Sequence, residues 1–236
     1  MSTIAIGIMC FGEDYYFEQI ESKLDKLKNG KIRCYVLTDK PNNFFGFTGY
    51  SKITIIPYHR HLKSYHDKMI LVKEILKYHD TAILIDADTS IIDYSFIDEL
   101  VKYPYQKGIT YVETLLGHKI KKEYVKDIQM NPNDIDWLNY KTYLQKIYPQ
   151  YGDLETIYEY FLVFNKEGLK DNFYQMYEKL QVIKESCDVI SGRKTVVGSG
   201  EGISIQVSAR ICGIQIQRDN ELHTLIKDKI DNINRI

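Results

Sequence analysis

Short apolar runs alternate with segments of helical periodicity along the first hundred residues. Apolar runs rich in β-branched side chains predict buried strands, here over residues 3–11, 31–39, 52–58 and 81–86. Between them, apolar residues recur every three or four positions, which predicts helices over 13–30 and 64–80. This alternation is typical of an α/β domain with a mostly parallel sheet, whose strands are apolar throughout because helices cover both faces.

The second half of the chain has a less regular pattern. Its clearest elements are a strand over 108–114, a strand over 158–166 and a helix over 168–186. Residues 117–153 are polar and rich in tyrosine, which predicts an inserted helical segment. Residues 193–218 predict an extended piece, a glycine turn and a short helix. The tail over 220–236 is polar, and we expect it to lie over the surface.

Two aspartates interrupt the apolar run "AILIDADTSII" over residues 82–92. Aspartate is rarely buried and is a poor strand former. Strand alternation would place Asp86 and Asp88 on one face, with Ala87 on the other. Ligands of parallel sheets bind beyond the carboxyl ends of the strands, so we expect the polar strand ends to converge on one crevice. These ends are Cys10-Phe11, Thr38-Asp39 and Asp86-Asp88.

Two neighbouring carboxylates repel each other unless a proton or a cation lies between them. A hard divalent ion such as Mn²⁺ or Mg²⁺ prefers oxygen ligands and leaves room for phosphate oxygens. The pair Asp86 and Asp88 therefore predicts a clamp for a metal ion and a diphosphate. The alternative interpretation is a solvated turn whose aspartates cap the next segment.

Composition excludes several other classes of protein. The chain of 236 residues is 44% hydrophobic and 27% charged, which is ordinary for a globular protein. Its 31 basic and 32 acidic residues argue against a dedicated nucleic-acid binder. No apolar run approaches the roughly 20 residues that span a bilayer, and "MSTIAIGIMC" does not resemble a signal peptide. We therefore expect a cytoplasmic protein with reduced cysteines, which are Cys10, Cys34, Cys187 and Cys212.

The segment "HDKMILVKEILKYHDTAILIDADTSI" over residues 66–91 resembles the core of nucleotide-sugar glycosyltransferases of the GT-A fold. It is most similar to family-8-like and related groups, in which a helix leads into a strand that ends in "LDAD". The resemblance implies a single GT-A type domain over 1–236, with a nucleotide-binding half over 1–100. The acceptor half and the tail would then occupy 101–236.

The resemblance also implies a donor site and a metal site. The aspartate pair would bind Mn²⁺ (or Mg²⁺), which holds the diphosphate of the donor, and a late histidine, His223, would complete the metal shell. An exposed tail histidine is the alternative for His223. Lys68 would face the diphosphate, with His66 beside it. The full set of implied donor-binding residues is Cys10, Phe11, Tyr15, Thr38, Asp39, His66, Lys68, Asp86 and Ala87.

An acidic residue near the acceptor is the remaining feature that such folds imply. Glu201 in "GSGEGISIQ" fits, because glycines let the backbone turn into a helix there. The alternative role for Glu201 is a favourable interaction with the helix dipole only. Glu155 and Glu159 are its rivals as catalytic acids. The chain has "VFNKEG" where many family-8 members have "FNSG", so inversion and retention both stay open.

These features predict a metal-dependent hexosyl- or pentosyltransferase that moves a sugar from a nucleotide diphosphate sugar to a glycan or another hydroxyl acceptor. A nucleic-acid acceptor is an alternative that we do not favour, and nothing in the sequence indicates the oligomeric state. Two other functions stay open. One is a non-catalytic relative that only binds sugar nucleotides. The other is a haloacid-dehalogenase-like phosphatase that uses Asp86 and Asp88.

Overall fold

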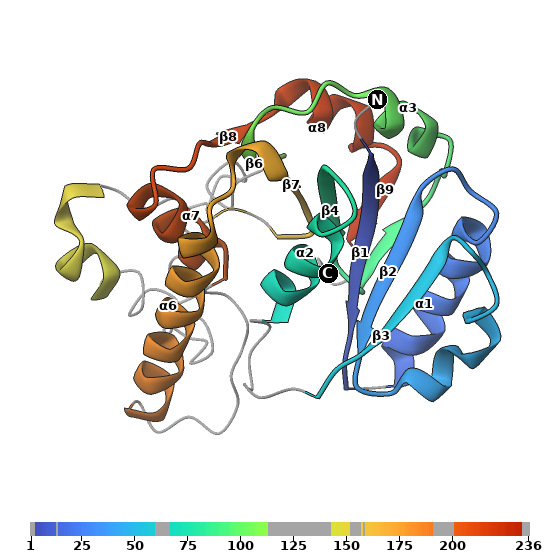
Figure 1. Cartoon of the computed structure of the whole chain (residues 1–236), viewed down its shortest axis with the longest axis horizontal. Coiled ribbons are helices and arrows are strands. Elements are labelled where there is room, and N and C mark those ends of the chain that lie inside the picture. The colour runs from blue at the N-terminus through green and yellow to red at the C-terminus, as the bar shows by residue number, and fades with distance from the viewer. Residues whose placement is uncertain are drawn as a thin grey trace, which may run out of the picture.

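The strands of the protein form one large sheet with helices on both faces (Figure 1). The computed structural model describes residues 3–12, 14–59, 67–112, 143–151, 157, 159–190 and 201–232. Along the sheet the strands follow the order β3-β2-β1-β4-β7-β6-β8. Only β7 runs antiparallel to its neighbours; the other strands share one direction. The expected α/β architecture with a mostly parallel central sheet is confirmed.

The strands of this sheet are β1 (Ile4–Cys10), β2 (Arg33–Thr38), β3 (Ile53–Pro57), β4 (Thr81–Ile85), β6 (Gly108–Tyr111), β7 (Phe161–Asn165) and β8 (Ile216–Arg218). A second, two-stranded sheet joins β5 (Thr89–Ile91) to β9 (Ile230–Asn232). The helices are α1 (Asp14–Leu27), α2 (Lys68–Leu76), α3 (Phe96–Lys102), α6 (Asp171–Ile190), α7 (Glu201–Ile211) and α8 (Asn220–Ile226). Short 3₁₀ turns are η1 (Pro41–Phe47), η3 (Pro149–Tyr151) and η4 (Lys166–Gly168).

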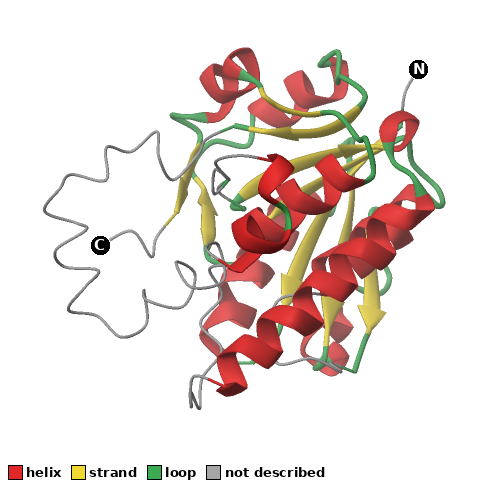
Figure 2. Cartoon of the chain, turned by 90° about the vertical axis from the view of Figure 1, so that its left-hand side faces the viewer, coloured by secondary structure: helices red, strands yellow, loops and turns green. Residues whose placement is uncertain are grey.

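Side chains of β1 alternate between two hydrophobic cores, one on each face of the sheet. Ile6 and Ile8 pack into the core that α1, α3 and α8 cover. Ala5 and Met9 pack into the core that α2, α6 and α7 cover. Figure 2 shows the sheet between these helices. Because both faces are covered, the parallel strands are apolar at nearly every position.

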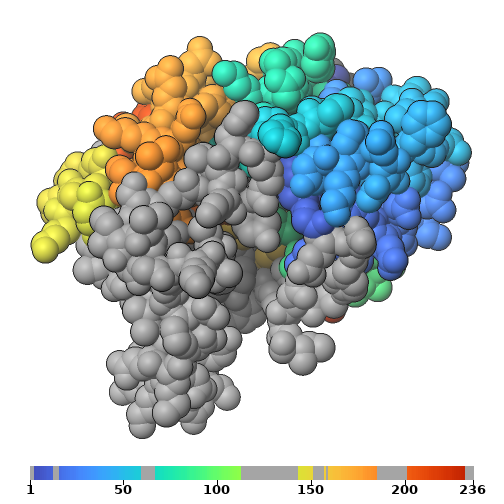
Figure 3. All heavy atoms as spheres, turned by 90° about the horizontal axis from the view of Figure 1, so that it is seen from below, coloured from blue at the N-terminus to red at the C-terminus, as the bar shows by residue number. Residues whose placement is uncertain are grey.

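Helix α2 packs very closely over β1 because residue 7 is a glycine. A Cβ atom at Gly7 would lie 2.8 Å from Ile75 Cδ1 and from Leu84 Cδ2. This contact places the first residue of α2 near the carboxyl ends of β1 and β4. Figure 3 looks at the molecule from below, with the first half of the chain in blue and cyan on one side and α6 in orange on the other.

Most expected elements are present, and their ends differ by a few residues. The structure adds α3, β5 and η1, which the sequence pattern did not indicate. The helix over 64–80 is described only from residue 67, and most of the inserted segment over 117–153 lies outside the described residues. The strand over 108–114 is described as far as residue 112.

The expectation that the tail lies over the surface is wrong. Leu222, Ile226 and Ile230 are buried in the core on the α1 face. Asp219 caps α8 by accepting a 2.9 Å hydrogen bond from the Leu222 N–H. Strand β9 then pairs antiparallel with β5, directly after the aspartate pair. Three apolar side chains spaced among charges are thus sufficient to dock this segment.

Cys10, Cys34 and Cys212 are buried and free of disulfides. The side chain of Cys187 lies outside the described residues. Of the helices in the described part of the chain, none is long and apolar enough to cross a membrane.

Candidate active site

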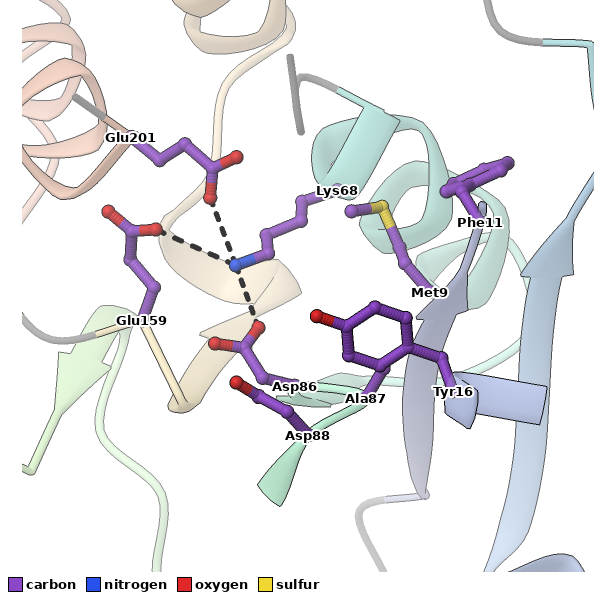
Figure 4. Close-up of a pocket in the computed structure, with 9 residues that line it drawn as sticks. All are labelled: Met9, Phe11, Tyr16, Lys68, Asp86, Ala87, Asp88, Glu159 and Glu201. Atoms are coloured by element: carbon purple, nitrogen blue, oxygen red, sulfur yellow. Dashed lines mark ion pairs between the residues drawn. The ribbon is translucent and has the colours of Figure 1, made fainter. Parts of the chain in front are cut away.

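A cavity of about 220 Å³ opens where β1 and β4 end, on the α2 side of the sheet (Figure 4). Its floor comes from Met9 and Phe11 at the end of β1 and from the turn after β4. Tyr16 of α1 closes one side. The described residues that line the cavity are Met9, Phe11, Tyr16, Lys68, Asp86, Ala87, Asp88, Glu159 and Glu201.

The aspartate pair lies in a turn and not in a strand. Strand β4 ends at Ile85, and the Thr89 N–H donates a 3.1 Å hydrogen bond to the Asp86 carbonyl, which closes the turn. The Asp86 N–H donates to the Tyr160 carbonyl at 3.2 Å, so the turn is also tied to the segment before β7. The alternation of side chains along a strand therefore does not explain where the Asp88 side chain points. The carboxylates of Asp86 and Asp88 nevertheless line the same cavity.

Lys68 is the centre of the charged groups in the cavity. It is the first residue of α2 and is only 6% exposed. Its Nζ lies 2.8 Å from Asp86 Oδ1, 2.9 Å from Glu201 Oε2 and 3.6 Å from Glu159 Oε2 (Figure 4). The lysine thus joins three carboxylates from three separate segments of the chain.

A glycine allows Glu201 to enter this cluster. A Cβ atom at Gly202 would lie 2.2 Å from the Ile157 carbonyl oxygen, so only glycine lets the start of α7 approach that backbone. The Gly202 N–H donates a hydrogen bond to Glu159 Oε1. Glu201, at the first position of α7, is 2% exposed as a result. Gly202 thus acts by close packing within α7, whereas Gly198 and Gly200 of the predicted turn lie outside the described residues.

Burial and mutual repulsion control the charges in the cluster. Burial lowers the pKa of Lys68, but Asp86, Glu201 and Glu159 outweigh burial and hold that pKa well above its ordinary value. Burial raises the pKa of Asp86, and Lys68 opposes the rise. Burial, reinforced by the charge of Glu201, raises the pKa of Glu159 well above 4.5. The fold therefore favours the protonated form of the Glu159 carboxyl.

The residues of the cavity fit a divalent cation. Four carboxylates line the cavity, those of Asp86, Asp88, Glu159 and Glu201, and Lys68 carries the single ammonium among the described lining residues, so carboxylates are in excess. Glu201 Oε1 is buried and has no hydrogen-bond partner within the described part of the chain. Among the described residues, no group of three or more His, Cys, Asp or Glu side chains is placed so that it could hold a metal ion. A two-carboxylate site that leaves further positions to phosphate and water matches the way Mg²⁺ is commonly bound.

Other residues expected at the site lie elsewhere. Cys10 and Thr38 are completely buried and do not line the cavity, and Asp39 is exposed outside it. His223 lies on α8, and the structure does not bring it together with the aspartates. The side chain of Tyr15, and the residues His66 and Glu155, lie outside the described part of the chain.

Sequence reasoning missed three residues around the cavity. Met9 and Tyr16 line it, and the sequence pattern indicates only that they belong to the strand over 3–11 and the helix over 13–30. Lys23 is buried and donates a hydrogen bond to the Ala87 carbonyl. Its position on the apolar stripe of α1, between Ile20 and Leu27, is a signal that was available, because a lysine on a buried helix face needs a partner.

No protein-family model matches the chain, and no curated protein matches it in sequence. Among solved structures, it is similar to the galactosyltransferase LgtC in complex with donor and acceptor sugar analogues, at 12% identity and a TM-score of 0.48, over 84% of this chain and 68% of that one. It is also similar to the mannosyltransferase PcManGT from Pyrobaculum calidifontis in complex with GDP-Man and Mn²⁺, at 12% identity and a TM-score of 0.46, over 94% of this chain and 55% of that one.

Replacing Glu159 with glutamine tests the protonation of the cluster. The unfolded chain loses the Glu159 proton near pH 4.5, whereas the folded protein keeps it to higher pH. Wild-type stability therefore falls relative to Glu159→Gln as pH rises above 4.5, by at most about 1.4 kcal/mol per pH unit. Urea unfolding of both proteins between pH 4.5 and 8 measures this difference.

The matched control is Glu178→Gln on the exposed side of α6, which should leave the pH dependence unchanged. Parallel stability curves for Glu159→Gln and the unmodified protein would show that Glu159 ionises normally in the fold.

Proposed function

We propose that this protein is a glycosyltransferase that moves a sugar from a nucleotide diphosphate sugar to a hydroxyl acceptor and uses Mn²⁺ or Mg²⁺. The observation that carries the proposal is the excess of carboxylates in a cavity at the carboxyl ends of parallel strands. Such a cavity attracts a hard cation, and the cation in turn attracts a diphosphate. The acceptor is a glycan or another molecule with a free hydroxyl.

Asp88 and the Asp86 oxygen that does not contact Lys68 are the proposed metal ligands. When bound, the metal neutralises the charge that develops on the departing diphosphate. His223 is not in this ligand set because it lies on α8, outside the cavity. The Phe11 and Tyr16 rings line the same cavity and offer apolar faces to the nucleoside.

The proposed reaction forms a bond between the acceptor oxygen and the anomeric carbon of the sugar. The bond from that carbon to the diphosphate breaks, and the nucleoside diphosphate leaves with the electron pair. The acceptor hydroxyl loses its proton, which an ionised carboxylate can take up. Glu201 is the candidate because its Oε1 is unpartnered among the described residues, whereas burial and Glu201 favour a protonated Glu159. In this proposal Glu159 positions Gly202 by accepting a hydrogen bond from its N–H, and its protonated carboxyl donates a hydrogen bond to the sugar.

The metal role is tested with Asp88→Asn, which preserves the size of the side chain. We expect the affinity for UDP or GDP in the presence of Mn²⁺ to fall by roughly 10- to 100-fold or more, since a carboxylate ligand is lost. Isothermal titration calorimetry with and without Mn²⁺ measures the affinity. Asp98→Asn, an exposed residue of α3, is the control and should bind like the unmodified protein. Metal-dependent binding that survives unchanged in Asp88→Asn would exclude the proposed clamp.

Glu201→Gln separates chemistry from binding. We expect donor affinity to be retained and turnover to fall by roughly 10²- to 10⁴-fold, because the proton acceptor is removed. If Glu201 only interacts favourably with the dipole of α7, the change lowers the free energy of unfolding by up to about 1 kcal/mol and turnover persists. Glu221→Gln, in the first turn of α8, is the matched control for an acid at a helix start.

Turnover is measured as the release of nucleoside diphosphate. When the acceptor is unknown, hydrolysis of the donor releases the same product and can be measured instead. A wild-type protein that binds donor and metal but releases no nucleoside diphosphate would be a non-catalytic binder, and the transferase proposal would be wrong.

A further inference from the structure

Lys23 is a buried lysine that contacts the aspartate turn from the side opposite to Lys68. It belongs to α1, is 4% exposed, and its Nζ donates a hydrogen bond to the Ala87 carbonyl. None of the ion pairs found among the described residues includes Lys23. Its ammonium is therefore held beneath the turn by a backbone carbonyl, and it does not line the cavity.

Burying this ammonium is costly, because an ion that leaves water loses its hydration and needs compensating contacts. Burial lowers the pKa of Lys23 to about 8, while the charges of Asp88, Cys10 and Asp86 work against the drop. Cys10 cannot supply a negative charge at neutral pH, because burial raises the pKa of its thiol to about 12. The two aspartates are therefore the anions that favour the charged form of Lys23.

Two buried lysines thus hold the turn from the two faces of the sheet. Lys68 of α2 binds the Asp86 carboxylate, and Lys23 of α1 binds the carbonyl of the next residue, Ala87. The intervening backbone is closed by the hydrogen bond from Thr89 to Asp86. With both anchors in place, the Asp88 carboxylate lines the cavity beside that of Asp86 (Figure 4).

We propose that Lys23 is a positioning residue, which fixes the Asp86–Asp88 turn and supplies positive charge behind it so that both aspartates face the metal and the diphosphate. This inference rests on the proposed function for its effect on ligand binding. Its effect on the turn itself does not depend on that function. The two effects can therefore be measured separately.

Lys23→Met distinguishes positioning from ordinary structural support. Replacing a buried charge with a side chain of similar volume is often neutral or stabilising, so we expect an equal or higher melting temperature. Affinity for UDP or GDP with Mn²⁺ should nevertheless fall at least tenfold. In a turnover assay the KM for Mn²⁺ should rise more than kcat falls. A purely structural lysine would instead lower the melting temperature and leave the KM for Mn²⁺ unchanged.

The matched control is Lys26→Met, one turn along α1 and exposed, which should change neither property. Amide hydrogen exchange over residues 86–89 is the second readout and should be faster in Lys23→Met than in the unmodified protein. Lys23→Arg, which keeps the charge and the donors, should recover part of the affinity. If Lys23→Met does not fold, Lys23→Gln takes its place, since it keeps an N–H donor without the charge.

Equal affinity and equal exchange in a folded Lys23→Met variant would overturn the positioning role. If the unmodified protein binds neither UDP nor GDP with Mn²⁺, the proposed function fails. In that case the comparison of amide hydrogen exchange over residues 86–89 between Lys23→Met and the unmodified protein alone decides whether Lys23 holds the turn.

Discussion

Repulsion among the carboxylates that line one cavity is the interaction on which the site depends. Asp86, Glu159 and Glu201 all contact one ammonium, that of Lys68, and Asp88 lies beside them in the same cavity. Even with Lys23 behind the turn, these four carboxylates outnumber the neighbouring ammonium groups, so a bound proton or cation would reduce the repulsion. The raised pKa of Glu159, caused by burial and by Glu201, is the first response. The divalent ion and diphosphate that we propose would be the second, and they would connect the electrostatics of the fold to the proposed chemistry.

The topology of the sheet brings these charges together. Asp86 follows β4, Glu159 precedes its antiparallel neighbour β7, and Lys68 and Glu201 are the first residues of α2 and α7. Two glycines make the approach close enough: Gly7 lets α2 pack onto β1, and Gly202 lets α7 contact the backbone at residue 157. Close packing between backbone elements, and not the sequence spacing of the charges, therefore creates the cluster.

The sequence predicts the first half of the fold well, because continuous apolar runs such as β1 and β4 identify strands covered on both faces. The place of Lys68 beside the aspartate pair was implied only by the resemblance of residues 66–91 to GT-A glycosyltransferases, and in the structure its Nζ lies 2.8 Å from Asp86 Oδ1. The docking of α8 and β9 escaped prediction because Leu222, Ile226 and Ile230 are dispersed among charged residues. The cluster of carboxylates around Lys68 could not be predicted from the sequence for another reason. The Glu159–Gly202 contact joins segments whose proximity is determined only by the tertiary fold.

We propose that the excess of carboxylates in this cavity binds a divalent cation together with a nucleotide diphosphate. Crystals grown with MnCl₂ and a nucleoside diphosphate, with anomalous scattering recorded for manganese, test it most directly. We expect a manganese peak within about 2.0–2.6 Å of carboxylate oxygens of Asp86 and Asp88, the range for hard cations and oxygen ligands, with the diphosphate on the same ion. Manganese or diphosphate bound only at another place on the protein would contradict it.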